Sequence, residues 1–116
     1  MIQITPHMRT LFARDPLNFR TGIDGTAAFC RQILKADPMS GTLFVFYNRK
    51  GTMLRFLVYD GQGFWFMVKR LSAGRFRFSK IFDGDHRVLD AHELTTLIWG
   101  GDPKGAPFGG YWRKIT

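Results

Sequence analysis

The chain has 116 residues, which fits one domain that can bury a hydrophobic core. Its composition is 45% hydrophobic, 22% charged and 16% aromatic, which excludes a disordered chain. A single cysteine excludes an internal disulfide, a thiolate zinc cluster and a Cys-x-x-Cys redox pair. The start lacks the basic and apolar regions of a signal peptide, and no apolar run approaches the roughly 20 residues of a membrane span. We therefore expect a cytoplasmic protein without a membrane partner.

The net charge of +8 is concentrated in one segment, which points to a polyanionic partner. Between Asn48 and Lys80 there are eight basic residues and one acid, Asp60. The rest of the chain has nine bases and eight acids. Solubility alone could also account for such a net charge, so the segment predicts polyanion contact without specifying it.

The first elements in chain order are a short strand at Met8–Ala13 and a helix at about Gly22–Lys35. Thr21 and Asp24 have the spacing of a capping box, with Asp in place of the usual Glu or Gln. Apolar residues then recur at helical spacing, and Pro38 ends the pattern.

The middle of the chain predicts an antiparallel meander, because aromatic and β-branched runs alternate with short turn signals. Tight hairpin turns need positive φ, so we expect it at one or more of Gly51, Gly61 and Gly63. The four predicted strands are Thr42–Tyr47, Thr52–Tyr59, Phe64–Lys69 and Arg75–Phe78.

Two of these strands lack a purely polar second face, so we expect both sheet faces to be at least partly covered. We expect the five phenylalanines of the middle strands to lie in the core: Phe44, Phe46, Phe56, Phe64 and Phe66. The cover of the second face could be the second helix, the tail or another chain. Its mixed patch of Met53, Leu57, Trp65 and Met67 should be covered by the tail or by a second subunit, because exposed apolar patches of that size are unusual.

A second helix is predicted from Asp90, with Glu93 completing a capping box and Leu89 placed to contact Leu94. A Gly/Pro-rich tail follows and closes on Tyr111–Lys114. The expected fold is α+β: a meander of four to five strands with an N-terminal and a C-terminal helix. We expect one domain at 1–101 and a tail at 102–116.

No residue pattern predicts a catalytic, metal or cofactor site. His92 and Glu93 lack the second histidine of a zinc-protease helix. Cys30 lies on the apolar stripe of the first helix, which favours core packing over reactivity. Asp83, Asp85 and His86 form the tightest polar cluster, but Phe82–Asp85 is typical of a turn.

The remaining signal is the interleaving of bases and aromatic residues on the sheet, since such strand faces can stack on bases and contact phosphates. Arg55, Arg75 and Arg77 should project together from the side opposite the Phe-rich core. The predicted nucleic-acid-binding residues are Arg49, Lys50, Arg55, Lys69, Arg70, Arg75 and Arg77.

Four motifs in order give the chain a family resemblance over roughly Met8 to Trp99. They are Phe19-Arg20-Thr21-Gly22-Ile23-Asp24-Gly25, Asp37-Pro38-Met39-Ser40-Gly41-Thr42-Leu43-Phe44-Val45-Phe46, Tyr59-Asp60-Gly61-Gln62-Gly63, and Lys69-Arg70-Leu71 followed by Gly74-Arg75-Phe76. Together they resemble the TnpB-type accessory proteins of bacterial insertion-sequence 66 elements, which are distinct from the RNA-guided nucleases of the same name. Two departures are Phe78-Ser79, where the family has Trp-Pro, and the tail from Gly100.

The resemblance implies a non-enzymatic protein of a mobile element that works beside a separate transposase. It supplies no catalytic residues to carry over. The leading hypothesis is an accessory protein of transposition that binds DNA, the transposase or both. The alternatives are a protein-protein adaptor whose basic face meets an acidic partner, and a nuclease built on Asp83, Asp85 and His86.

Overall fold

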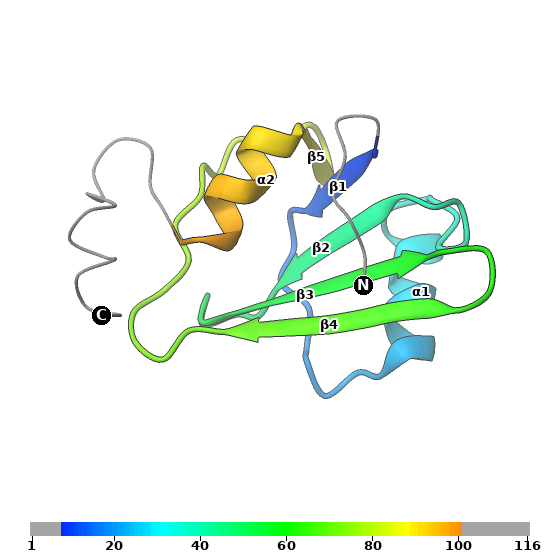
Figure 1. Ribbon diagram of the computed structural model, residues 1–116, viewed down its shortest axis with the longest axis horizontal. Coiled ribbons are helices and arrows are strands. Elements are labelled where there is room, and N and C mark those ends of the chain that lie inside the picture. The colour runs from blue at the N-terminus through cyan, green and yellow to red at the C-terminus, as the bar shows by residue number, and fades with distance from the viewer. Residues whose placement is uncertain (1–7, 101–116) are drawn as a thin grey trace.

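A computed structural model describes residues 8–100. One five-stranded sheet carries a helix on each face (Figure 1). The elements are β1 Thr10–Ala13, α1 Ile23–Gln32, β2 Leu43–Tyr47, β3 Met53–Tyr59, β4 Phe64–Arg70, β5 His86–Leu89 and α2 Ala91–Ile98. Within this part of the chain, no helix has both the length and the apolar character that crossing a membrane requires. The predicted tail at 102–116 lies outside the described residues.

The strand order is β4-β3-β2-β1-β5, so the sheet is not a simple meander. The predicted antiparallel hairpins β2-β3 and β3-β4 are confirmed. The predicted first strand instead lies inside the sheet, parallel to β2 and antiparallel to β5. The parallel pair follows from α1, which connects β1 to β2 and supplies the crossover that a parallel connection needs.

Both faces of the sheet are buried at β2 and β3, which explains why these two strands do not alternate between apolar and polar residues. One hydrophobic cluster includes Cys30 and Leu34 from the α1 side, packed with Phe44, Phe46 and Leu57 of the sheet. On the opposite face, residues of α2 pack on a second cluster, which includes Phe12, Val45, Leu54, Phe56, Leu94 and Leu97. The predicted core position is confirmed for Phe44, Phe46 and Phe56, and Phe64 and Phe66 are partly buried against the first cluster.

The predicted mixed face is wrong in its membership. The β3-β4 register places Trp65 opposite Val58 and Met67 opposite Phe56, so these two residues face α2. Met53 and Leu57 lie on the other face, and Leu57 is fully buried by this chain's own packing on the α1 side. A two-residue period allows strands to be patterned correctly while the faces of neighbouring strands are matched wrongly.

The predicted strand Arg75–Phe78 does not form, and β5 was not predicted. The predicted alternation of buried aromatic and exposed basic side chains in this segment is confirmed. Phe76 is buried, and Phe78 packs on Phe12 with ring centroids 4.9 Å apart, while Arg75 and Arg77 are exposed. The aromatic side chains enter the core on the α2 face without a strand ladder. β5 contains only two apolar residues, too few for a recognisable period.

The helix caps divide into one confirmed and one wrong prediction. Asp90 and Glu93 form the predicted reciprocal capping box of α2. The N-cap of α1 is Gly22, without a side-chain cap bond, so Thr21 and Asp24 do not form a box. The prediction of positive φ is confirmed in two hairpin turns, at Gly51 (φ 74°) and Gly61 (φ 97°).

Candidate nucleic-acid interface

A basic groove of about 980 Å³ lies where three segments meet: residues 16–20 before α1, residues 48–53 around the β2-β3 turn, and residues 70–74 at the end of β4 and just beyond it. Its lining contains four bases, Arg20, Arg49, Lys50 and Arg70, and no acid. All four side chains are exposed, and none forms an ion pair with another residue in the range 8–100. We call the surface formed by these three segments, with the four bases, the basic groove.

The β2-β3 turn presents two of these bases because its own polar groups are satisfied internally. The Asn48 side-chain oxygen accepts hydrogen bonds from the backbone N–H groups of Thr52 (2.9 Å) and Met53 (3.0 Å). The Asn48 amide donates to the Thr52 hydroxyl, and Gly51 takes the positive φ that closes the turn. Arg49 and Lys50 are left to point into solvent.

Arg55 was predicted to project from the sheet as an interface residue, but its side chain is buried, with only 5% exposed. Its guanidinium donates to the carbonyl oxygens of Thr21 (2.6 Å) and Phe19 (2.7 Å), the two residues that flank Arg20. The rings of Phe19 and Phe66 lie 4.3 and 4.6 Å from the guanidinium carbon. Arg55 faces α1 and does not share a surface with Arg75 and Arg77, so that expectation was wrong.

Burial lowers the pKa of Arg55. No carboxylate among residues 8–100 pairs with it, and carbonyl oxygens and aromatic rings take the place of one. The residue therefore serves as an anchor: it fixes the backbone on both sides of Arg20 and so holds one wall of the basic groove.

Lys69 is also engaged inside the protein. Its ammonium donates to the carbonyl oxygen of Ile98 (2.6 Å) at the C-terminus of α2 and lies 4.6 Å from the centre of the Trp99 ring. A cation at this place satisfies a terminal helix carbonyl and interacts favourably with the helix dipole. Burial lowers the pKa of Lys69, although these two contacts favour its charged form. Its predicted DNA contact stays untested.

Arg75 and Arg77 are exposed and extend the basic surface beyond the groove. The Phe76 N–H donates to the Gly51 carbonyl (2.8 Å), which joins this segment to the β2-β3 turn. A Cβ built on Gly51 would lie 3.9 Å from that of Arg75, so Arg75 sits at the groove rim.

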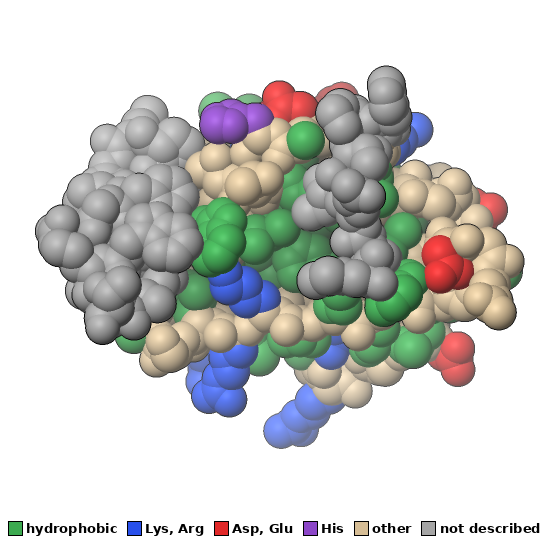
Figure 2. All heavy atoms as spheres, viewed as in Figure 1, with side chains coloured by type: hydrophobic (Ala, Val, Ile, Leu, Met, Phe, Trp, Pro, Cys, Tyr) green, Lys and Arg blue, Asp and Glu red, His purple; other side chains and the backbone are tan. Residues whose placement is uncertain are grey.

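No acidic residue is part of the groove lining. Figure 2 shows several Lys and Arg side chains along the lower edge of the molecule, whereas Asp and Glu side chains lie at the right-hand and upper edges. Asp60 follows β3, at the opposite end of that seven-residue strand from the groove. Seven residues span about 24 Å, well beyond the screening length of about 8 Å at physiological salt. Asp15, next to the groove lining, is paired with Arg14 at 3.1 Å.

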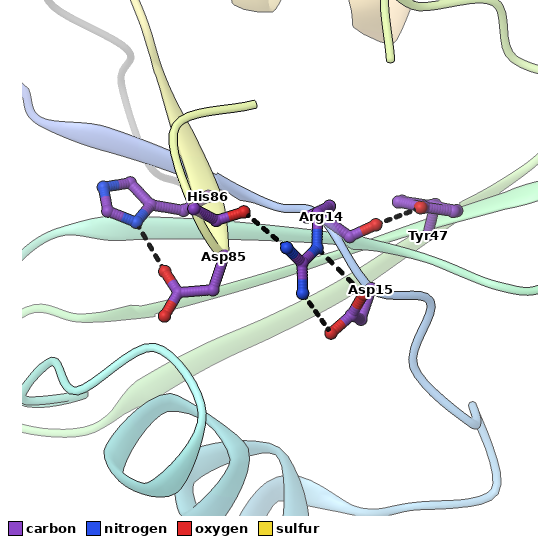
Figure 3. A network of polar contacts seen from close by, with 6 residues as sticks. Arg14, Asp15, Tyr47, Asp85 and His86 are labelled. Carbon is purple, nitrogen blue, oxygen red and sulfur yellow. Dashed lines mark hydrogen bonds and ion pairs between the residues drawn. The ribbon is translucent and has the colours of Figure 1, made fainter. Parts of the chain in front are cut away.

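The second polar cluster is structural (Figure 3). Asp83 and His86 form an antiparallel bridge around Gly84, which confirms the predicted turn. Asp85 contacts the His86 ring at 2.7 Å, and Arg14 donates to the Gly84 carbonyl at 2.9 Å. The part of the chain described by the structure has no group of three His, Cys, Asp or Glu side chains able to hold a metal ion.

Two other candidates also have structural roles. Cys30 is buried in the core, as predicted, and burial raises the pKa of its thiol to about 12. Glu93 closes the capping box of α2, and the neighbouring His92 is exposed. The Gly61-Gln62-Gly63 segment is a hairpin turn in which the carboxylate of Asp60 accepts two backbone N–H bonds.

Arg20 is the groove residue that the sequence did not predict. The predicted bases all lie in the charge-rich segment from Asn48 to Lys80, whereas Arg20 reaches the groove from the loop before α1. The available signal was its place in the motif Phe19–Gly25, which folds around Arg55.

One comparison with known proteins identifies a family. Residues 8–106 match the model of the IS66 Orf2-like proteins. Two proteins of Sinorhizobium fredii, named uncharacterized proteins y4jC and y4hO, are 33% and 31% identical to this chain over 102 residues. Each alignment covers 88% of this chain, with 86% of y4jC and 88% of y4hO. No solved structure matches the chain significantly. The chain thus belongs to the IS66 Orf2-like family, the accessory proteins of IS66 insertion sequences.

Proposed function

We propose that this accessory protein binds the DNA backbone through its basic groove during transposition. The observation that supports the proposal is the lining of the groove: four exposed bases from three separate segments, without an acid. Exposed Arg75 adds a further base at the rim. Bases placed in this way neutralise phosphates and release counterions, which is the main source of sequence-independent affinity for DNA.

The groove is better suited to holding DNA than to reading its sequence. Long basic side chains on turns and loops suit phosphate contacts, which set position and orientation without selecting bases. The family relationship adds the second part of the proposal: the protein presents DNA to a transposase encoded by the same element, and the transposase carries out the strand chemistry.

The test removes one base from each wall of the groove. The triple variant Arg20→Gln, Lys50→Gln and Arg70→Gln is compared with wild type by fluorescence anisotropy, using a short duplex over a series of salt concentrations. Each lost phosphate contact changes the slope of log affinity against log salt by about 0.9. We expect a slope flatter by about 2.7 if each base makes one contact, and weaker binding for every sequence tested.

The matched control loses the same charge elsewhere. Arg9, Arg31 and Lys35 are exposed and lie outside the groove lining, and the Arg9 carbonyl accepts the N–H of Leu43 at the opposite end of β2 from the turn. Changing these three residues to Gln should alter the slope far less. Equal effects of both triple variants would refute the groove and leave only net charge. If neither variant changes DNA binding while the groove variant loses the transposase, the groove is a protein-binding surface.

A further inference from the structure

The outer edge of strand β4 is unpaired in the described residues and is complementary to the same edge of a second copy. β4 is the last strand of the sheet, and among residues 8–100 it pairs only with β3 (Figure 1). It is seven residues long and lacks proline, and bases occur only at its last two positions. Three apolar side chains along it are exposed, Trp65 (37%), Met67 (37%) and Val68 (50%). Long, regular and apolar edges of this kind are templates for pairing with another chain.

Two backbone hydrogen bonds at the ends of the β3-β4 ladder show which N–H and C=O groups of β4 have no partner in β3. The Asp60 N–H donates to the Gly63 carbonyl at the turn end of the hairpin, and the Leu71 N–H donates to the Thr52 carbonyl at its open end. Both pairs continue the register of β3 and β4. Hydrogen-bonded pairs alternate with non-bonded pairs in an antiparallel ladder. The N–H and C=O groups of residues 65, 67 and 69 therefore face β3, and those of residues 64, 66, 68 and 70 point away from the sheet.

We propose that two copies of this protein pair through β4, antiparallel, with a two-fold axis at Met67. Of the symmetric registers, this one pairs the whole strand, because residue 64 then lies opposite residue 70 of the second copy. In this register, Phe66 of one copy lies opposite Val68 of the other. The backbone N–H and C=O groups of both residues point away from their own sheets, so they can hydrogen-bond to each other. Met67 meets its own copy as a non-bonded pair, and the two five-stranded sheets become one continuous sheet.

The side chains of this register complement one another on both faces. On the α2 face, Trp65 lies opposite the stem of Lys69 from the second copy. On the α1 face, Phe64 lies opposite Arg70, and aromatic and cationic side chains attract each other. Like charges never face each other directly, because each base is opposite an aromatic ring. A self-complementary strand with this charge pattern favours a second copy over an unrelated peptide, and an isologous two-fold contact is the commonest arrangement of oligomers.

A cysteine crosslink tests the register. Residues opposite each other in a non-bonded pair have Cα atoms about 4.5 Å apart, within the range of about 4.4–6.8 Å for a disulfide. Met67→Cys should therefore form an intermolecular disulfide under mild oxidation. Trp65→Cys should not, because its own copy would be four residues away along the strand, about 14 Å. The native Cys30 is buried, so the wild type serves as the blank.

Proline substitution tests the edge itself, with solution mass as the measurement. Val68→Pro removes an outward N–H without breaking the ladder to β3, so we expect the dimer to give way to a monomer of 13.4 kDa. The matched control is Val88→Pro on β5, the opposite edge, where the Arg14–Asp85 bond likewise leaves Val88 facing outward. The control should stay dimeric. A monomeric wild type, loss of the dimer only in the Val88 variant, or crosslinking of Trp65→Cys in place of Met67→Cys would each overturn the proposal.

Discussion

Replacing Arg55 by methionine tests whether a buried arginine without a carboxylate can hold a loop in place. Methionine keeps the apolar bulk between the rings of Phe19 and Phe66 and removes the donors. The two shortest bonds, to the carbonyls of Thr21 (2.6 Å) and Phe19 (2.7 Å), would be lost. Hydrogen bonds to a charged group contribute about 1.5–3 kcal/mol each.

The expected loss is smaller than the sum of these bonds. The buried guanidinium has lost hydration, which is why burial lowers the pKa of Arg55, and methionine carries no such desolvation cost. Both carbonyls are only part-buried, so water can reach them after the change. We expect Arg55→Met to lower the free energy of unfolding by about 2 kcal/mol. Arg55→Lys, which can keep one donor in place, should cost about half as much.

Urea unfolding followed by circular dichroism measures this difference, with exposed Arg77→Met as the matched control, expected within about 0.5 kcal/mol of wild type. Hydrogen exchange gives a local measurement: the Thr21 amide, bonded to the Asn18 carbonyl at 3.0 Å, should exchange faster in Arg55→Met. If Arg55→Met stays within the range of the control and Thr21 keeps its protection, Arg55 is not the anchor of this loop.

Two further predictions concern a turn and a helix cap. Hydrogen bonds from the backbone N–H groups of Gly63 and Gln62, and from the indole of Trp65, hold the pKa of Asp60 below its ordinary value of 3.8. This contribution to stability is present above that value and is lost as the pH falls through the lower, folded-state pKa. Wild type should therefore lose more stability than Asp60→Asn in urea titrations taken from neutral pH to about pH 3, and identical pH dependence would contradict this. Asp90→Ala should cost about 1 kcal/mol because it removes the α2 cap, whereas Thr21→Ala, which removes no cap, should cost less; equal losses in the same titrations would show that the box contributes nothing.

Local patterns predicted most of the elements, and pairing between distant segments was the part that failed. The hairpins β2-β3 and β3-β4 followed from strand composition and glycine turns, and both have short sequence separations. The place of β1 depends on β5, which has too few apolar residues to be recognised. The segment Arg75–Phe78 has a strand period without a strand: its aromatic side chains pack into the core, while the Phe76 N–H donates to the Gly51 carbonyl in a turn and no strand ladder forms.

The predicted exposure of the basic residues was correct where it follows from turn chemistry. Arg49 and Lys50 lie in a tight turn and are exposed as expected. Arg55 is in the centre of a strand covered by α1, and the sequence does not reveal that a helix covers that face. Arg20 joins the groove through tertiary contacts of its loop, those of Arg55 among them, so neither assignment could come from spacing along the chain.

The position of β1 has a consequence for how this chain reaches its native state. β1 near the N-terminus is bonded on one side to β5, and Ala13 lies beside His86, 73 positions later in the chain. Bringing β1 and β5 together is slow compared with forming either hairpin. The chain must lose the entropy of the long intervening loop before the contacts between the two strands can stabilise it. We therefore expect β2, β3 and β4 to assemble early, and β5 with α2 to dock last over Phe12. A chain truncated after Asp85 would lack the residues that β5 and α2 add to the cluster around Phe12, and its β1 edge would be open to association with other unfinished chains.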